Sequence, residues 1–551
     1  MIVDPFSLTT DQVETDVCVV GAGPAGITIA REFLNRNVQV ALIESGDVDF
    51  NEKVQELADG AVHGDPIVPP VVSNLRQFGG NAHLWHMQIG ENRLGVRYCA
   101  LDDIDFEKRD WIPHSGWPFD RNHLLPFYER AQAVCQIGPF TYTADHWEDE
   151  QRRRMSMDES ILETRVYQFG PSDAFHTSYR KDLEAAKNIS LFNHSNVVEI
   201  ITNEAGTEIV RARVMRLDGQ QYWIAAKQFI LATGGYGNAK LLLSSNNQQP
   251  NGVGNQHDVV GRYYHDHPEF LGGYITPNDS NIFNNMALYD MRRVAGTTVM
   301  GFLQLSEKVL RENQLLNCNT MLFPRPNQRA VAAVESIRSI GQGRSIKSLL
   351  RLKNLINIGK GIPPIAKAAF NSKFKKQTLL PYFCHDGWSE TLDNRKLFER
   401  LEIRHMLEQS PDPENRVTLG SNRDALGCRK LEVHWRLQKS DLENFKQSLD
   451  LASHQLRASG LGDYQIDLNE AGLPNPTSPM GSHHLMGTTR MHGDPRKGVV
   501  NADCQVHGID NLFVAGSSTF PTAGHANPTL TIIAMALRLA DFVGERLTGR
   551  N

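Results

Sequence analysis

The sequence Asp16-Val-Cys-Val-Val-Gly-Ala-Gly-Pro-Ala-Gly26 decides the fold of this chain. The apolar run 16–20 predicts a buried parallel strand, and the glycine cluster after it predicts a tight turn. Apolar residues at helical spacing over 27–35 predict a helix, and 38–44 predicts a second strand that ends at Glu44. The stretch therefore predicts a strand–helix–strand unit of the dinucleotide-binding type.

Each glycine of this turn has a different expected role. Gly21 permits the turn, Gly23 lets the backbone approach a pyrophosphate, and Gly26 lets the helix pack closely on the strand. Glu44 follows Gly26 by 18 residues, close to the spacing expected for a carboxylate that binds a ribose diol. The alternative is a glycine-rich turn of some other α/β fold, which would lack such a carboxylate.

Two later stretches are predicted to join the same sheet. Residues 228–235 and 511–516 are both apolar runs that end in glycine. We therefore predict an α/β protein whose Rossmann-type nucleotide-binding domain is discontinuous, over 13–100, 190–275 and 478–551. The remaining segments, 101–189 and 276–477, are predicted to form a substrate-binding domain. No second GxGxxG occurs, so a separate NAD(P)H domain is not supported.

Composition excludes several classes of protein. The 551 residues carry 57 Lys and Arg against 63 Asp and Glu, a formal charge of −6, which argues against general nucleic-acid binding. The seven cysteines are scattered without a CxxC, so neither a disulfide framework nor a metal site is predicted. We read no signal peptide and no apolar run long enough to span a bilayer, and we expect a cytoplasmic protein.

The segment 336–377 is the one strongly basic stretch, with ten Lys and Arg and no Asp or Glu. We interpret it as a solvated helical excursion within the substrate-binding domain. The alternative is a basic amphipathic element that makes weak peripheral contact with a membrane or an acidic partner.

The chemistry is expected near the C-terminus, in 481–491 and 516–531. Asn527 suits the N-cap of a helix and Pro528 its first turn. The helix is indicated by the apolar spacing of Ile532, Met535, Ala536 and Leu539. Its N-terminus would be a positive site able to face a ring that gains negative charge.

At this point the chain resembles the glucose–methanol–choline (GMC) family of FAD oxidoreductases, and most of all its bacterial sugar and polyol oxidoreductases and pyranose oxidases. The matching pieces are spread along nearly the whole chain: Gly21–Gly26 with Glu44, Gly79-Gly80 with Trp85, Ser115-Gly-Trp-Pro118, His484–Met491 and Asn527–Thr531. The resemblance implies a Rossmann-type FAD domain and a substrate domain with an antiparallel sheet over the flavin. It implies FAD-dependent oxidation of a carbinol, with hydride passing to flavin N5 and then to oxygen or a quinone-like acceptor.

The resemblance also implies roles for particular residues. His484 matches the family's base, and Asn527 matches its partner. The residues expected at the cofactor are Gly80, Val197 or Val198, Gly516, Ser517, Asn527, Pro528 and Thr529. The position that carries covalently bound FAD in pyranose oxidases corresponds to Leu84, so non-covalent FAD is predicted.

The chemistry of alcohols supports a histidine base independently. An alcohol releases hydride with difficulty while its hydroxyl proton remains, so a base within hydrogen-bond reach is needed. Histidine titrates near ~6.5, so its neutral form is available at pH 7. His483 and His525 are alternatives that would line the substrate pocket. Two other functions stay open: a lyase on the same scaffold, similar to the hydroxynitrile lyases, and a flavin-binding protein without turnover.

Overall fold

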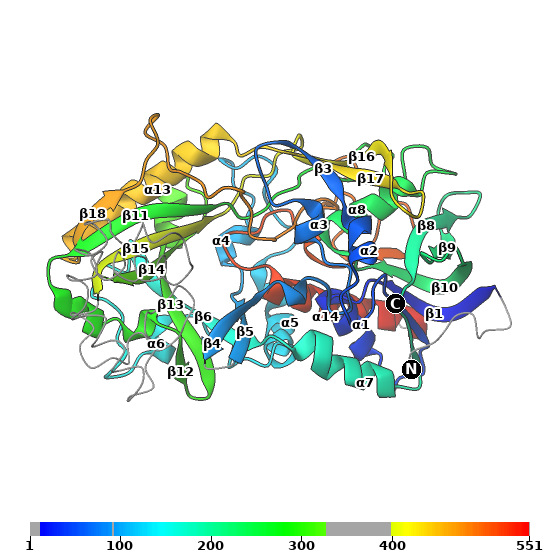
Figure 1. Cartoon of the computed structure of the whole chain (residues 1–551), viewed down its shortest axis with the longest axis horizontal. Helices are drawn as coiled ribbons and strands as arrows, with labels where there is room; N and C mark the ends of the chain where they lie inside the picture. The colour runs from blue at the N-terminus through cyan, green and yellow to red at the C-terminus, as the bar shows by residue number, and fades with distance from the viewer. Residues whose placement is uncertain (1–10, 91–92, 327–397, 550–551) are drawn as a thin grey trace, which may run out of the picture.

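The computed structural model describes residues 11–90, 93–326 and 398–549, so the basic segment 336–377 lies outside the described residues. Two sheet-bearing halves lie side by side along the long axis of the molecule (Figure 1). The half that contains the N-terminal glycine turn also contains the C-terminal helix. The two ends of the chain therefore build one half together.

A seven-stranded sheet organises this first half, in the order β7-β2-β1-β10-β9-β8 with β19 paired to β10. The pairings of β1 with β2 and β10, of β2 with β7, and of β10 with β19 are parallel. The strands are β1 (Gln12–Val20), β2 (Val40–Ile43), β7 (Ile189–Phe192), β8 (Asn196–Thr202), β9 (Ile209–Met215), β10 (Gln221–Leu231) and β19 (Leu512–Val514). The Rossmann-type fold is confirmed, and the four predicted strands correspond to β1, β2, β10 and β19.

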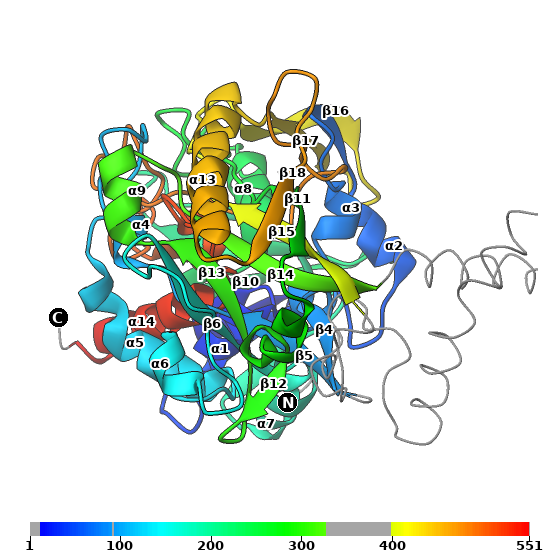
Figure 2. The ribbon, with the colours of Figure 1, turned by 90° about the vertical axis from the view of Figure 1, so that its left-hand side faces the viewer.

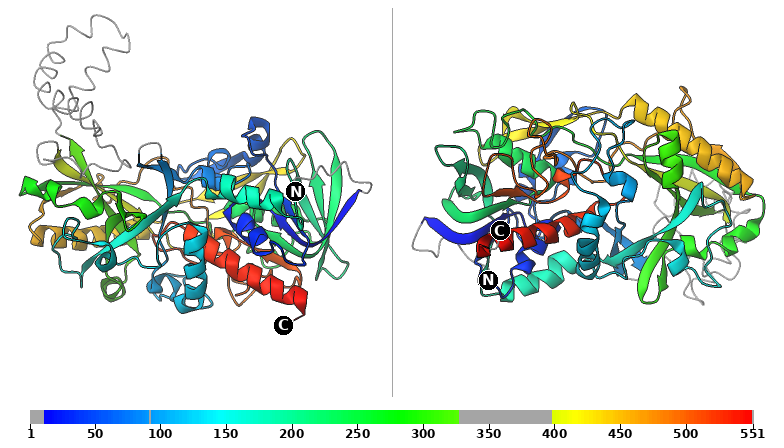
Figure 3. Two further views of the ribbon diagram at one scale, coloured as in Figure 1. Left: turned by 90° about the horizontal axis from the view of Figure 1, so that it is seen from below. Right: turned by 180° about the vertical axis from the view of Figure 1, so that it is seen from behind.

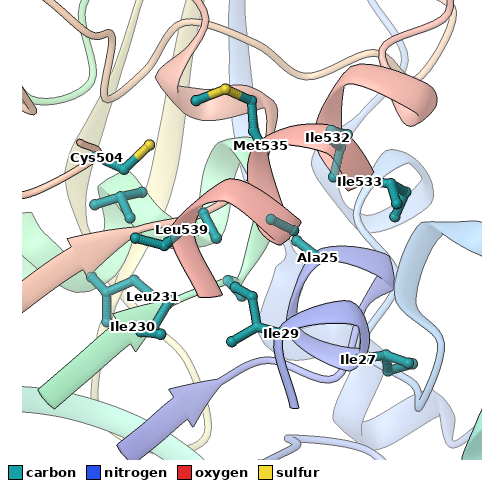
Figure 4. Packing of buried hydrophobic residues seen from close by; sticks show 14 of the residues in the cluster. Ala25, Ile27, Ile29, Ile230, Leu231, Cys504, Ile532, Ile533, Met535 and Leu539 are labelled. Atoms are coloured by element: carbon teal, nitrogen blue, oxygen red, sulfur yellow. The ribbon is translucent and has the colours of Figure 1, made fainter. Parts of the chain in front are cut away.

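Helices α1 (Pro24–Glu32) and α14 (Thr529–Thr548) bury their apolar faces against this sheet. Figure 4 shows Ala25 and Ile29 of α1 beside α14, with Ile230 and Leu231 at the end of β10 next to Leu539. The α14 residues that predicted a helix from their spacing are all buried. Burying a large aliphatic side chain contributes about 1.5–3 kcal/mol, so this cluster fixes α14 on the nucleotide-binding half.

The second half is built on a nine-stranded antiparallel sheet, in the order β18-β11-β15-β14-β13-β6-β5-β4 with β12 on β13. Helix α13 (Lys439–Ala458) lies across this sheet (Figure 2). The strands are β4 (His86–Gly90), β5 (Arg93–Tyr98), β6 (Leu162–Pro171), β11 (Glu269–Pro277), β12 (Arg292–Val294), β13 (Thr297–Leu305), β14 (Cys318–Pro326), β15 (Phe398–Leu407) and β18 (Gly462–Ile466). The predicted antiparallel sheet is confirmed.

A three-stranded sheet, β16-β17-β3, completes the first half. It joins β3 (Gly60–Gly64) to β16 (Arg416–Arg423) and β17 (Arg429–Trp435). This pairing differs from the predicted boundaries, which placed 416–435 with the substrate-binding segments. Strands β4, β5 and most of β11 lie within the segments predicted for the nucleotide-binding domain, but they pair in the large sheet of the second half. Tertiary pairing decides these memberships, and the sequence pattern of a single strand does not name its partner.

The remaining helices of the described residues are mostly short. They include α2 (Glu52–Gln55), α3 (Pro70–Ser73), α4 (Asp103–Phe106), α5 (Arg121–Val134), α6 (Ala144–Trp147), α7 (Tyr179–Ala185), α8 (Gly234–Ser244) and α9 (Glu307–Asn313). Figure 3 shows α14 running along the first half to the C-terminal end of the chain. Among the helices described, none combines the length and the apolarity needed to cross a membrane.

Candidate active site

A long cleft runs through the first half, along the ends of the parallel strands. It encloses about 1360 Å³ of empty space, including the part that opens to solvent. Its wall includes the predicted residues Gly21, Gly23, Glu44, Gly80, Val198, His483, His484, Gly516, Ser517 and Pro528. Segments from three distant parts of the chain thus meet at the edge where ligands bind in open α/β sheets.

The glycine turn leaves one face of α1 free for a pyrophosphate. Gly23 is the N-cap of α1, and no side chain caps the helix there. A Cβ built on Gly23 meets no atom within 4 Å, whereas one built on Gly26 overlaps the carbonyl oxygen of Gly21. Gly23 therefore keeps space open for a ligand, and Gly26 permits close packing of helix and strand. Free N–H groups at a helix N-terminus form an anion site.

Glu44 stands at the end of β2 and is nearly fully buried. Its carboxylate accepts hydrogen bonds from the backbone N–H of Ala22 at 2.9 Å and of Gly46 at 2.8 Å. These bonds hold the carboxylate beside the glycine turn and in the wall of the cleft. A carboxylate has about four lone-pair positions, so acceptor capacity remains for a ribose diol.

Two ring nitrogens in the cleft wall are buried and have no hydrogen-bond partner among the described residues. They are Nε1 of Trp85 and Nδ1 of His483. His483 adopts a left-handed backbone conformation, with φ of 61°. An unpaired buried polar group costs about 1–3 kcal/mol. A polar ligand that reaches these atoms would remove the cost, and a flavin ring system offers suitable polar edges.

Arg76 is a cleft residue that the sequence did not single out. Its Nη2 donates to Oδ1 of Asn196 at 2.9 Å, and its Nε has no partner among the described residues. Burial lowers the pKa of this guanidinium, while the carboxylates of Glu44 and Asp424 act in the opposite direction. Arg76 thus places a positive charge near Glu44 in the wall of the cleft.

Asn527 meets His484, which lies in the cleft wall. Nδ2 of Asn527 lies 3.1 Å from Nε2 of His484, and the side chain of His484 is 5% exposed. The prediction that Asn527 caps a helix is wrong. The cap position of α14 is Pro528, no side chain caps the helix, and both polar atoms of the Asn527 amide are engaged elsewhere.

The hydrogen bonds around His484 assign its tautomer. Arg97 can only donate, and its Nε donates to Oδ1 of Asn527 at 2.8 Å. Asn527 therefore turns its NH₂ to His484, so Nε2 of His484 accepts and carries no proton. The proton of the neutral ring then sits on Nδ1, which donates to Nδ1 of the fully buried His267 at 2.9 Å. Arg97 thus fixes the lone pair of His484 on Nε2 through Asn527.

Burial keeps this histidine neutral. The pKa of His484 is lowered well below 6.5, chiefly by burial and then by His267 and Arg97. Burial also lowers the pKa of His267 to about 3. The His484 ring in the cleft wall is therefore an uncharged base at pH 7.

Asp266 positions the segment that carries His484. Its Oδ1 accepts from the backbone N–H groups of His267 at 2.7 Å, Ser482 at 3.0 Å and His484 at 3.2 Å. Gly481 has a φ of 103°, and a Cβ there would lie 2.7 Å from Oδ2 of Asp266. The glycine therefore lets the loop close onto the carboxylate. Burial raises the pKa of Asp266 to about 6.

Four predicted site residues lie outside the cleft wall: Gly26, His525, Asn527 and Thr529. His525 is 1% exposed, and its Nε2 donates to Oε1 of Gln304 at 2.8 Å. Thr529 is buried in the first turn of α14. Their predicted roles, like those of the other site residues, stay predictions.

The residues that the sequence missed carried weak signals. Arg97 is one of two arginines in the short strand β5, and His267 belongs to the run His265-Asp-His267. Neither pattern points to His484, because the contacts join segments far apart in the chain.

Two models of known protein families match the chain. The model for FAD dependent oxidoreductases matches residues 16–336, more than half of the chain. The model for GMC oxidoreductases matches residues 411–536, which include the His484 segment. The fold and the cleft define a nucleotide-binding oxidoreductase, and the chain belongs to the FAD-dependent oxidoreductases of the GMC family. FAD is its cofactor, as the glycine turn and the cleft predict.

The individual relatives either have low sequence identity or match only a part of the chain. A 2-methyl-1,2-propanediol dehydrogenase from Mycolicibacterium austroafricanum is 22% identical, over 98% of this chain and 97% of that protein. A paromamine 6'-oxidase from Streptomyces fradiae is 34% identical, but the match spans only 27% of each chain. The solved structure of a formate oxidase from Aspergillus oryzae aligns with a TM-score of 0.51 and 16% identity, over 98% of this chain and 100% of that one. That last likeness concerns the fold.

Proposed function

We propose that this enzyme oxidises the carbinol of a sugar, cyclitol, polyol or glycosylated metabolite to a carbonyl, with His484 as the base. The observation that carries the proposal is the neutral imidazole of His484 in the wall of the cofactor cleft, whose Nε2 lone pair is held beside the amide of Asn527. A base in this state is what alcohol oxidation requires.

The proposed proton path uses only groups around His484. A substrate hydroxyl that enters beside Asn527 takes over the contact with Nε2 of His484 and gives up its proton there. The Nδ1–H bond to His267 holds the ring in place while Nε2 becomes protonated. Bound FAD supplies the hydride acceptor when it lies in the cleft.

Arg97 and Asn527 would stabilise the oxygen that loses its proton. The amide NH₂ of Asn527 can donate to that oxygen, and the guanidinium of Arg97 lies directly behind the amide. Donors arranged before the reaction stabilise developing negative charge without reorganisation. Arg97 also packs over the ring of Tyr167, 4.7 Å from its centroid, which restricts its motion.

The substrate class rests on the relatives. A diol dehydrogenase matches nearly the whole chain, and a paromamine oxidase and a pyranose 2-oxidase from Tricholoma matsutake match shorter parts. These names favour polyols and sugars as substrates. They include both dehydrogenases and oxidases, so the acceptor is proposed as oxygen or a quinone-like compound.

An anaerobic substrate screen tests the proposal. A panel of sugars, cyclitols and polyols is mixed with the FAD-loaded protein, and the flavin absorbance near 450 nm is followed. We expect at least one alcohol to bleach the flavin and oxygen or a quinone to restore the colour. Turnover of a cyanohydrin without bleaching would favour the lyase. Bound FAD that no member of the panel reduces would favour a non-catalytic flavoprotein.

We further propose that FAD is held non-covalently, because Leu84 occupies the position expected to carry the covalent bond. Acid precipitation should leave FAD in the supernatant and a colourless pellet. A yellow pellet would contradict this, and His83 beside Leu84 would be the first attachment site to examine by peptide mapping.

A further inference from the structure

A group of metal-type side chains lies on the small sheet β16-β17-β3. His63 of β3 is directly opposite His434 of β17 in the parallel register. Glu432 is two residues before His434, so both side chains project from the same face of the strand. Oε2 of Glu432 lies 4.0 Å from Nε2 of His63 and 3.9 Å from Nε2 of His434. The three ligand atoms all lie within 4.8 Å of one another.

The neighbouring strand holds this carboxylate in place. Glu432 lies against Gly420 of β16, where a Cβ would come within 3.0 Å of its Cδ. The absence of a side chain at Gly420 therefore leaves the space that the carboxylate fills. The rings of His63 and His434 are stacked, with centroids 4.7 Å apart.

The charges that face the cluster permit a cation. Arg416 of β16 is directly opposite His434, but its Nη2 donates to Asp258 at 2.8 Å. Thr418 is opposite Glu432, and its hydroxyl lies 3.4 Å from Nε2 of His434.

We propose that His63, Glu432 and His434 bind a divalent transition-metal ion of the zinc type, with water completing the coordination. Two imidazoles and one carboxylate suit such ions, whereas Mg²⁺ and Ca²⁺ prefer oxygen ligands. Bonds of about 2.0–2.2 Å require the two stacked rings to turn toward a common point. The side chains are 37–48% exposed, so they have room for that rotation.

The strands that carry the metal site lead into the wall of the cofactor cleft. Leu57, shortly before β3, lines the cofactor cleft, and so do Asp424, Leu426 and Cys428 in the turn that leads into β17. The carbonyl of Leu57 and the carboxylate of Asp424 both accept from Lys240. A metal that joins β3 to β17 would hold these two parts of the wall together, so FAD should leave the cleft more slowly.

The test uses the FAD-loaded protein after treatment with a chelator. Titration with ZnCl₂ in a calorimeter measures stoichiometry, and the fluorescence of released FAD after dilution measures its dissociation rate. We expect one high-affinity Zn²⁺ per chain and a several-fold slower release of FAD, with no such effect of MgCl₂. H63Q and H434Q should lose both effects, and E432Q should weaken both.

His454→Gln is the matched control, because His454 is an exposed histidine on α13 away from this sheet. It should behave as the wild type. Zn²⁺ binding by H434Q with unchanged affinity would overturn the site. Zn²⁺ binding at the site without slower FAD release would overturn its link to the cleft. Neither measurement involves substrate, so both outcomes are independent of the proposed reaction.

Discussion

The amide of Asn527 lies between Arg97 and His484, 2.8 Å from the guanidinium on one side and 3.1 Å from the imidazole on the other. Only one assignment of donors and acceptors fits these two hydrogen bonds, because arginine has no acceptor. It leaves the lone pair of the His484 ring on Nε2. The pair His484 and Asn527, which the family resemblance indicates, thus depends on Arg97 of strand β5 in the large sheet.

Replacement of His484 by Ala should leave FAD bound, because the pyrophosphate turn and Glu44 are far from this position in the cleft. Reduction of the flavin by the alcohol should slow by about 10²–10⁴-fold, the usual contribution of a positioned general base. The residual rate should rise with pH as hydroxide in solvent removes the proton. Anaerobic stopped-flow absorbance measures the step. A rate near that of the wild type would transfer the role to His483 or His525.

Replacement of Asn527 by Asp should be more harmful than replacement by His. An aspartate would pair with Arg97 and place a carboxylate about 3 Å from Nε2 of His484. Opposite charge favours the protonated imidazole and raises its pKa, so flavin reduction should require a higher pH than in the wild type. Asn527→His can still donate a hydrogen bond. Equal pH profiles for the two variants would contradict this assignment.

Replacement of Arg97 by Met should slow flavin reduction by about 10–100-fold, equivalent to the ~1.5–3 kcal/mol of a hydrogen bond to a charged group. Without the guanidinium, the Asn527 amide can turn its oxygen to His484 and favour the wrong tautomer. The reduction rate of Arg97→Lys should lie between those of the wild type and Arg97→Met, since lysine keeps the charge but not the planar guanidinium. The dependence of the flavin reduction rate on pH should differ from that of the wild type only in Arg97→Met, which should be slow at neutral pH. A purely structural role would lower thermal stability and leave that profile unchanged.

Flavin reduction in the wild type should be independent of pH between about 7 and 8, above the pKa of about 6 of Asp266, which holds the His484 segment. The base acts in its neutral form, and burial lowers the pKa of His484 well below 6.5. The acid limb of the profile therefore moves to lower pH, and His267, with a pKa of about 3, does not titrate in this range. Rapid-mixing measurements across the range check this. An acid limb centred near pH 6.5 would show that the base is an ordinary solvated histidine.

Gly23→Ala and Gly26→Ala should separate cofactor binding from folding. The Cβ at Gly23 enters open space, so the protein should keep its thermal stability but bind FAD at least about tenfold more weakly, a loss of ~1.4 kcal/mol or more. The Cβ at Gly26 overlaps the backbone of Gly21, so that variant should be destabilised with or without FAD. Thermal melts and FAD titration of the apoprotein distinguish the two. Tight FAD binding by Gly23→Ala would place the pyrophosphate elsewhere.

Much of the first half follows from local pattern. The strand–turn–helix of 16–35, the strands near 228 and 511, and the helix from 529 each bury residues whose spacing predicted them. The N-cap was misplaced by one residue because Asn527 suits two roles, and the local sequence does not say which contact its amide makes. The predicted boundaries also differ from the structure for β16 and β17, because a strand's partner is set by packing across the whole chain.

The sequence by itself determined the family and its cofactor, through motifs spread along nearly the whole chain. It also determined the turn that receives the cofactor, because that turn depends on glycines and a carboxylate at fixed spacing within one continuous unit. Only the tertiary structure decided the state of the base. Arg97, Asn527, His484 and His267 come from four separate elements, and their hydrogen-bond directions exist only once the large sheet meets the nucleotide-binding half. The same holds for His63 and His434, whose two strands meet only in the folded chain.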